Sequence, residues 1–231
     1  MEQQTGHSEE QGEGNSEALD FRWDTADVMT RLHTGWQQEI IDVAKNFKTE
    51  RVLEPPHSTS REGADVERLV VHCVGGKVVQ RELAWLVELY RGRFREIGEE
   101  FRRERLFTAA DPRYAVVLNV QVPGKRYECH VDTNPVEALL YVTDHPEGTG
   151  GELTVAKDVH ARCQEEIDAN CVTLHPREGE LVFFDGRFHP HYVRRQTGAI
   201  RVAVAMNYYT ESVPESTRPD DLNDYLYGPQ A

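Results

Sequence analysis

The amino-acid sequence predicts an α+β protein in which a β-sandwich or jelly roll is supported by the helices that precede it. Up to about residue 110, apolar residues recur at steps of three and four, as in amphipathic helices. After Asp111-Pro112 the pattern changes to short β-rich runs, separated by turns that contain Gly or Pro. A chain of 231 residues can bury one sizeable core, and the sequence shows no repeat of fixed period.

Two helices are expected in the first half of the sequence. The first is predicted from about Asp24 to Phe47, with Asp24 or Thr25 as its N-cap. Residues 50–65 are predicted to form a loop, because two consecutive prolines interrupt them. The second helix, which is long and amphipathic, is predicted from Val78 to Phe101. We interpret the aromatic residues on both helical stripes as core residues.

Five strands are predicted after Asp111-Pro112, where runs of β-branched and aromatic residues are bounded by turn residues. They are expected at Tyr114–Val122, Val136–Thr143, Glu152–Val155, Glu180–Phe184 and Arg201–Tyr209.

The two ends of the chain differ from its middle. Residues 1–18 contain five acidic residues and no Lys or Arg, so we expect a disordered acidic tail. Residues 19–212 are predicted to form a single domain, helical to about 110 and a jelly roll over 112–210. Residues 213–231 are a polar C-terminal extension. It carries three bulky residues that could dock on the domain: Tyr225, Leu226 and Tyr227.

Composition limits the classes of partner. Hydrophobic residues make up 39% of the chain and charged residues 29%, which is ordinary for a globular protein. The formal net charge of −14 argues against a broad phosphate-binding surface, so no nucleic-acid partner is expected. The sequence shows no signal peptide and no membrane-length apolar run. With four cysteines and no CxxC pair, we therefore expect a cytoplasmic protein without a membrane partner. Its oligomeric state is not predicted.

A histidine–X–aspartate followed by further histidines is the most informative motif. His130 and Asp132 would point to the same side of a strand, because side chains at i and i+2 share a face. About sixty residues later stand His189 and His191, which strand parity alone cannot separate. Two imidazoles and one carboxylate form a facial triad, a ligand set that suits non-haem Fe(II) and leaves coordination positions open. The other histidines of this region are expected in surface loops and turns: His145, His160 and His175.

Three stretches around this motif resemble the C-terminal half of the 2-oxoglutarate/Fe(II)-dependent oxygenases. They read LLYVTDHPEGTGGELTV, PREGELVFFDGRFHPHYV and QTGAIRVAVAMNYY, and the resemblance covers about residues 112–210. It is strongest to the prolyl-hydroxylase-type branch and its small-molecule hydroxylase relatives, and it implies a double-stranded β-helix (jelly roll). In that family an Arg or Lys lies ten residues beyond the last ligand. Arg201 is ten residues beyond His191, so the resemblance selects His191 over His189.

The resemblance also implies the cofactors and their binding residues. Fe(II) would be bound by His130, Asp132 and His191, and the co-substrate 2-oxoglutarate and O2 would occupy the remaining positions. Arg201 would bind the distal carboxylate of 2-oxoglutarate, which needs a fixed cation.

Other positions depart from the family pattern or stay open. Asn119 and Gln121 stand where the family often has a Tyr, and we expect them to contact the co-substrate. Asn207 shares a strand face with Arg201 and would bind co-substrate or substrate, or be a satisfied core amide. Ala203 replaces a frequent Ser.

By resemblance, the expected reaction is hydroxylation of an unactivated carbon, with release of succinate and CO2. Asp132 favours it, because halogenating relatives have Gly or Ala there. Desaturation, cyclisation and epimerisation stay open. The expected substrate is a free amino acid or a natural-product intermediate, motivated by the compact length and the negative charge balance. The alternatives are a peptidyl (prolyl-type) hydroxylase acting on a protein, and a non-catalytic metal-binding jelly roll.

Overall fold

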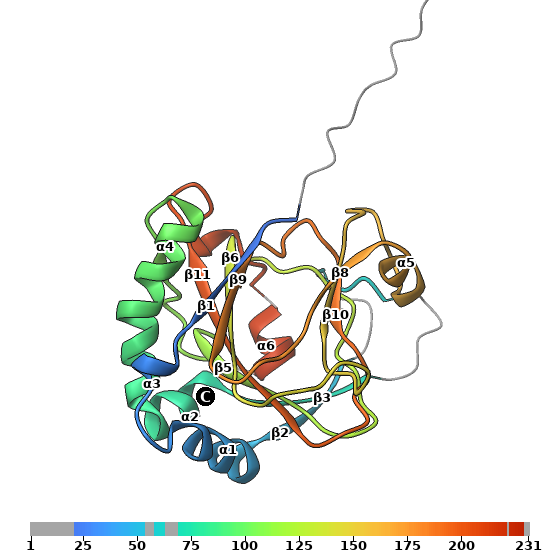
Figure 1. Ribbon diagram of the computed structural model, residues 1–231. Helices are drawn as coiled ribbons and strands as arrows, with labels where there is room; N and C mark the ends of the chain where they lie inside the picture. The colour runs from blue at the N-terminus through green and yellow to red at the C-terminus, as the bar shows by residue number, and fades with distance from the viewer. Residues whose placement is uncertain (1–20, 54–57, 63–68, 221, 229–231) are drawn as a thin grey trace, which may run out of the picture.

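Two antiparallel sheets pack face to face, and helices cover the outer face of the larger sheet (Figure 1). The computed structural model describes residues 21–53, 58–62, 69–220 and 222–228. The acidic tail predicted for residues 1–18 therefore lies outside the described residues. The predicted fold class, a jelly roll with N-terminal helices packed against it, is confirmed.

The larger sheet has eight strands within the described residues, in the order β1-β9-β6-β11-β5-β3-β2, with β4 paired to β11. Its strands are β1 (Trp23–Asp27), β2 (Thr49–Leu53), β3 (Leu69–Val74), β4 (Phe107–Thr108), β5 (Val116–Gln121), β6 (Val136–Tyr141), β9 (Glu180–Phe184) and β11 (Arg201–Tyr209). The smaller sheet has the order β10-β7-β8 and comprises β7 (Leu153–Ala156), β8 (Cys171–Leu174) and β10 (His191–Val193).

Alternation along β11 separates the two cores of the protein. Val202, Val204 and Met206 face the helices, while Ala203 and Ala205 face the smaller sheet. Every residue of β11 is buried, as expected for a strand that is covered on both sides. The two polar residues of this strand with the same parity as Ala203 and Ala205, Arg201 and Asn207, therefore point into the space between the sheets.

The helices of the N-terminal half pack on the large sheet through the first of these cores. They are α1 (Trp36–Phe47), α2 (Gly76–Glu82), α3 (Ala84–Leu89), the π-helical turn η2 (Tyr90–Phe94) and α4 (Arg95–Arg102). The predicted helix from Val78 to Phe101 is thus present, but it is interrupted at Leu83, whose ψ of 50° is not helical. Elsewhere lie α5 (Gln164–Ala169), α6 (Leu222–Tyr227) and two short 3-10 turns, η1 (Met29–Arg31) and η3 (Glu215–Thr217).

Two local predictions for the N-terminal region were wrong. The helix expected from Asp24 begins only at Trp36, after Gly35 in the left-handed conformation, and the residues before it form β1 and η1. β1 exists because it pairs with β9, a long-range contact that local periodicity does not reveal. The loop expected over residues 50–65 likewise begins with a strand, since Thr49–Leu53 pairs with β3.

The five strands predicted after Asp111-Pro112 are confirmed as β5, β6, β7, β9 and β11. Cys129 is fully buried in a small cluster with Tyr192 and Ile167, where it acts as a packing residue.

The segment after β11 returns to the body of the protein, so the docking considered for its bulky residues does occur. Tyr225 and Leu226 pack against a cluster made by Leu53, Leu69 and Val71. The backbone is also tied down, because Arg51 Nη2 donates a hydrogen bond of 3.0 Å to the carbonyl of Tyr227. In the ribbon view α6 lies between the two sheets (Figure 1).

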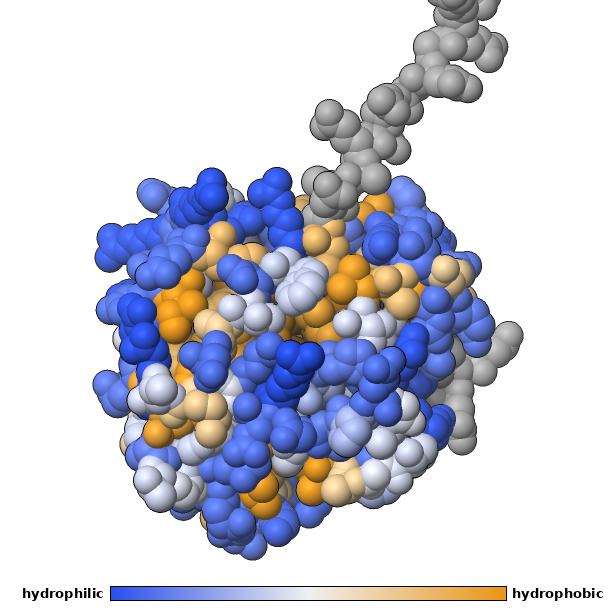
Figure 2. Space-filling model, viewed as in Figure 1, coloured by the Kyte–Doolittle hydropathy of each residue, from blue (hydrophilic) through white to orange (hydrophobic). Residues whose placement is uncertain are grey.

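The outer surface agrees with the high content of charged residues. The face shown in Figure 2 is mostly hydrophilic, with small hydrophobic patches between the polar side chains. Among the described residues, no helix combines the length and the apolar character needed to cross a bilayer.

We expect a buried tyrosine to link the helical layer to the sheet. Tyr90 Oη donates to the carbonyl of Asn207 at 2.7 Å and accepts from the amide of Ala109 at 2.8 Å. Tyr90→Phe leaves both groups unpaired and should lower the free energy of unfolding by about 1–3 kcal/mol. Urea denaturation measures this loss.

The comparison variant is Tyr208→Phe. Tyr208 is equally buried, but among the described residues its hydroxyl makes one hydrogen bond, to the carbonyl of Tyr90. Its removal should cost less than the removal of the Tyr90 hydroxyl. An equal or larger loss in Tyr208→Phe would contradict the linking role of Tyr90.

Candidate active site

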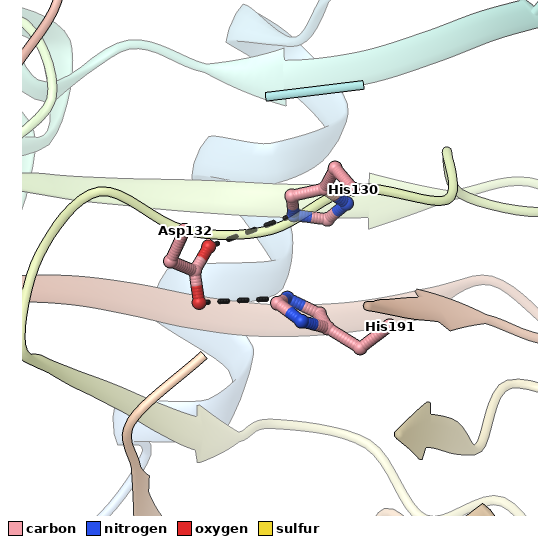
Figure 3. Close-up of side chains that lie close together, drawn as sticks. All are labelled: His130, Asp132 and His191. Carbon is pink, nitrogen blue, oxygen red and sulfur yellow. Dashed lines mark ion pairs between the residues drawn. The ribbon is translucent and has the colours of Figure 1, made fainter. Parts of the chain in front are cut away.

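Three side chains from two distant parts of the sequence converge between the sheets. His130, Asp132 and His191 each offer a ligand atom, and these atoms all lie within 4.8 Å of one another. Asp132 lies beside the two imidazoles and directs one carboxylate oxygen toward each (Figure 3): its Oδ1 is 3.6 Å from Nε2 of His130 and its Oδ2 is 3.4 Å from Nε2 of His191. Two imidazole nitrogens and a carboxylate oxygen suit a divalent transition metal such as Fe(II).

The backbone brings the two histidines together. The amide of His130 donates to the carbonyl of His191, and the amide of His191 donates to the carbonyl of His130, both at 2.9 Å. Residues paired in this way in an antiparallel ladder project to the same side. Their ring centroids are accordingly 4.4 Å apart.

Each imidazole is oriented by a second hydrogen bond. Nδ1 of His130 lies 2.8 Å from the carbonyl of Glu128, and Nδ1 of His191 lies 2.9 Å from the carbonyl of His189. A carbonyl can only accept, so Nδ1 carries the proton in each ring and Nε2 has a free lone pair. This is the tautomer that a metal ligand needs.

Asp132 reaches the histidines from a loop rather than from a strand. The sequence prediction placed His130 and Asp132 on one strand, but His130 makes only isolated bridges and Asp132 lies outside the strands. The amide of Asp132 donates to the carbonyl of Gly186 at 3.0 Å. A Cβ at Gly186 would lie 2.1 Å from Oδ2 of Asp132 and 2.8 Å from Cε1 of His191, so glycine is required there.

The electrostatics of the three groups fit a cation site. Burial acts to raise the pKa of Asp132, but the nearby groups His191, His130 and Arg218 hold it below its usual value. Burial also acts on His191, yet Asp132 raises the pKa of that imidazole. Oδ2 of Asp132 is buried without a hydrogen-bond partner. A metal ion would supply the missing partner of this oxygen.

His189 is placed apart from these groups. It lies in the bend before β10, where its Nδ1 is 2.9 Å from the carbonyl of Ala156, and its ring packs edge-on against Phe21. Of the two histidines that parity could not separate, the structure brings His191 to the cluster.

Arg201 begins β11 and is 2% exposed. Its Nε and Nη2 are buried and make no hydrogen bond, and burial lowers the pKa of the guanidinium. A buried cation without a partner is costly, so these two donors are suited to an incoming carboxylate. The hydroxyl of Tyr141, whose ring centroid is 5.4 Å from the guanidinium carbon, is also buried and unpaired. An acceptor placed beside Arg201 would meet both groups.

A cavity of about 900 Å³, its open mouth included, joins the triad to Arg201. Asn119 and Asn207 line it as well, whereas Gln121 is not among its lining residues. Gln121 Nε2 instead donates to the carbonyls of Lys125 and Arg194, both at 2.7 Å. Asn207 Nδ2 donates to the carbonyl of Tyr114 at 2.8 Å, so one side of this amide is already satisfied.

Glu137 is a buried carboxyl group in the same cavity. Burial and the nearby charge of Asp132 raise its pKa well above the usual range, although Asn134 Nδ2 donates to it at 3.0 Å.

Sequence reasoning missed or misplaced several residues of the site. His145, expected on the surface, is 5% exposed, and burial together with the charge of Arg201 lowers its pKa. Tyr141 reads as an ordinary strand residue until its pairing with β11 is known. Gly186 had a signal in the sequence, since FDGRFHPH places a glycine five residues before the ligand His191.

The C-terminal segment supplies another part of the cavity wall. Arg218, Leu222, Leu226 and Tyr227 all line it. Nη1 of Arg218 donates to Oγ1 of Thr133, the residue next to Asp132, at 2.6 Å. The segment is therefore a structural part of the site.

Comparisons with known proteins agree with this arrangement. Residues 115–209, which include the triad and Arg201, match the 2OG-Fe(II) oxygenase superfamily. No curated protein matches the sequence of the chain.

Solved structures share the fold. One is an oxidoreductase of the 2OG-Fe(II) oxygenase family from Burkholderia pseudomallei (TM-score 0.57, 13% identity, 81% of this chain and 84% of that chain). Another is the non-heme alpha ketoglutarate dependent epimerase SnoN from nogalamycin biosynthesis (TM-score 0.58, 16% identity, 90% and 86%). A third is a prolyl hydroxylase from Trichoplax adhaerens in complex with a hypoxia inducible factor peptide fragment (TM-score 0.50, 15% identity, 85% and 87%).

The assignment of His191 as a ligand can be tested with matched asparagine variants. Asn can keep the Nδ1-type hydrogen bond to a backbone carbonyl but has no group in place of Nε2. We expect His191→Asn to abolish binding of Mn(II), used in place of iron, in calorimetric titration. His189→Asn should bind the metal like the wild type. Loss of metal in His189→Asn with retention in His191→Asn would reverse the assignment.

Gly186 provides an independent test of the packed centre. Gly186→Ala places a methyl group against Asp132 and His191, so metal affinity should fall on the order of 10- to 100-fold. Gly198→Ala is the matched control, because a Cβ there meets nothing within 4 Å. Unchanged Mn(II) affinity in Gly186→Ala would show that the centre can rearrange.

Proposed function

We propose that the protein hydroxylates an unactivated carbon of a small molecule, a free amino acid or a natural-product intermediate, because residues 115–209 match the 2OG-Fe(II) oxygenase superfamily. The match implies Fe(II), 2-oxoglutarate and O2 as cofactor and co-substrates. The observation that carries the proposal is one cavity that contains both the triad and a buried, unpaired arginine.

In this proposal, metal binding and co-substrate binding are carried out by different side chains. His130, Asp132 and His191 would hold the iron through Nε2, a carboxylate oxygen and Nε2. Arg201, with Tyr141 beside it, would bind the distal carboxylate of 2-oxoglutarate. When bound, the iron and 2-oxoglutarate supply the activation of O2, with formation of succinate and CO2 and insertion of one oxygen atom into the substrate.

Other residues shape the surroundings of the reaction. The apolar side chains between the sheets exclude water from the guanidinium of Arg201, which strengthens its attraction for a carboxylate. Leu222, Leu226 and Tyr227 narrow the space available to a substrate from the side of the C-terminal segment. A cavity completed in this way supports a compact substrate.

A peptide substrate is the second candidate, because one of the similar structures is a prolyl hydroxylase that holds a peptide. The two are separated by incubating the protein with Fe(II), 2-oxoglutarate and either free amino acids or proline-containing peptides. Mass spectrometry then identifies the product that gains an oxygen atom, and succinate is quantified in parallel. Absence of 2-oxoglutarate-dependent succinate formation with every compound would refute the oxygenase assignment itself.

The role of Arg201 is tested by its effect on 2-oxoglutarate. Loss of a charge-assisted contact in a buried site is worth about 2–5 kcal/mol, or roughly 30- to several-thousand-fold in affinity. We expect Arg201→Ala to raise the KM for 2-oxoglutarate by that amount and Arg201→Lys by less, since lysine offers a point charge. Succinate formation measured against 2-oxoglutarate concentration gives both values.

The control is Arg194→Lys, because Arg194 pairs with Asp168 and is not among the cavity-lining residues. Its KM should stay near the wild-type value, and Mn(II) affinity without 2-oxoglutarate should be the same in all four proteins. An unchanged KM in Arg201→Ala would mean that another group binds the distal carboxylate.

A further inference from the structure

The cavity contains a second guanidinium that the cofactors do not use. Arg218 lies between η3 and α6 and lines the cavity. Like Arg201, it makes no ion pair with a carboxylate among the described residues. The distal carboxylate of 2-oxoglutarate accounts for the buried Arg201. Arg218, which is half-buried, needs a different explanation.

Neutral contacts fix the position of Arg218. Its Nε donates to Oδ1 of Asn223 at 2.8 Å, and its Nη1 donates to Oγ1 of Thr133 at 2.6 Å. Its guanidinium carbon lies 4.1 Å from the ring centroid of Tyr114. All three partners are uncharged, so these contacts hold the guanidinium in one orientation without a direct ion pair. Nε and Nη1 each donate to one of them, and the remaining N–H groups on Nη1 and Nη2 are the donors that a carboxylate could meet.

The position is on the metal side of the cavity. Thr133, which accepts from Arg218, directly follows the ligand Asp132. Adjacent Cα atoms are about 3.8 Å apart, so an anion held by this pair lies close to the centre that carries the oxidation.

The lining around Arg218 is mixed. Leu222, Leu226 and Tyr227 offer apolar surface, while the carboxyl groups of Glu128, Asp132 and Glu137 also line the cavity. The arginines of this lining are Arg201 and Arg218, so once 2-oxoglutarate is bound to Arg201, Arg218 is the guanidinium left for the acidic group of a substrate.

Resting on the proposed function, we infer that Arg218 and Thr133 form a substrate subsite that binds the carboxylate of a small organic acid. This deepens the choice of substrate. An internal proline of a peptide has no free carboxylate to present, whereas a free amino acid or an acidic biosynthetic intermediate does.

Arg218 also holds the C-terminal segment in place through its hydrogen bonds. The test must therefore separate this structural role from binding of the substrate carboxylate. Arg113 is the matched control. It fastens the same segment through Asp224 and the carbonyl of Gly228, and it is not among the cavity-lining residues. Arg113→Gln loosens the segment and leaves the charge in the cavity, while Arg218→Gln removes the charge.

The probes are the protein L-amino acids and simple hydroxy and aromatic carboxylic acids, each beside its primary amide. Binding is measured by calorimetry and thermal shift with Mn(II) and 2-oxoglutarate present. At least one acid should bind the wild type more tightly than its amide. Arg218→Gln should weaken that acid about 30-fold or more, Arg218→Lys less, and Arg113→Gln by no more than about threefold. Affinity for 2-oxoglutarate should be unchanged in Arg218→Gln.

Three results would overturn the subsite: equal binding of every acid and its amide, unaltered binding in Arg218→Gln, or an equal loss in Arg113→Gln. A lowered 2-oxoglutarate affinity in Arg218→Gln would assign the arginine to the co-substrate instead. Because these measurements use Mn(II) and no turnover, they stand apart from the oxygenase assignment. That assignment fails only if the Fe(II)-loaded protein forms no succinate.

Discussion

The pairing of His130 with His191 is the constraint on which the candidate active site depends. Two reciprocal backbone hydrogen bonds join residues that are far apart in the sequence, and they leave both side chains on one side of the ladder. Both ring orientations then follow from carbonyls two residues earlier in the chain. The metal geometry is thus set mainly by the main chain, and the carboxylate of Asp132 is added from a loop that Gly186 holds in place.

The second half of the fold could be predicted from sequence because its strands are buried on both faces and bounded by turns. β6, β9 and β11 are mostly apolar and almost entirely buried strands of this kind. β1 could not be predicted, since its residues are mostly exposed and its extended form comes from pairing with β9. The spacing of Val28 and Trp36 matches that of a helical stripe, although the chain changes from strand to helix between β1 and α1.

Some residues of the site could likewise be predicted from local sequence patterns, whereas others depend on contacts between distant parts of the chain. His130, Asp132, His191 and Arg201 could be proposed from motif spacing together with the family resemblance. The environment of His145 and Tyr141 could not, because it arises where separate strands meet around Arg201. Gln121 shows the opposite limit: its face was predicted correctly, but its amide is engaged with backbone carbonyls of neighbouring loops. The position of a residue along a strand predicts to which face its side chain points. The hydrogen-bond partner of that side chain depends on which loops fold over the strand.

The absence of a side chain at Gly186 has an evolutionary consequence. The space that a Cβ would need is filled by the carboxylate of Asp132 and the ring of His191, so the glycine is required only while both ligands are in place. In a lineage that lost the metal, selection at this position would relax and larger residues could accumulate. The residue at this position is therefore a marker that can be read from sequence alone. It distinguishes relatives that keep the metal ligands from homologues that keep only the jelly-roll fold.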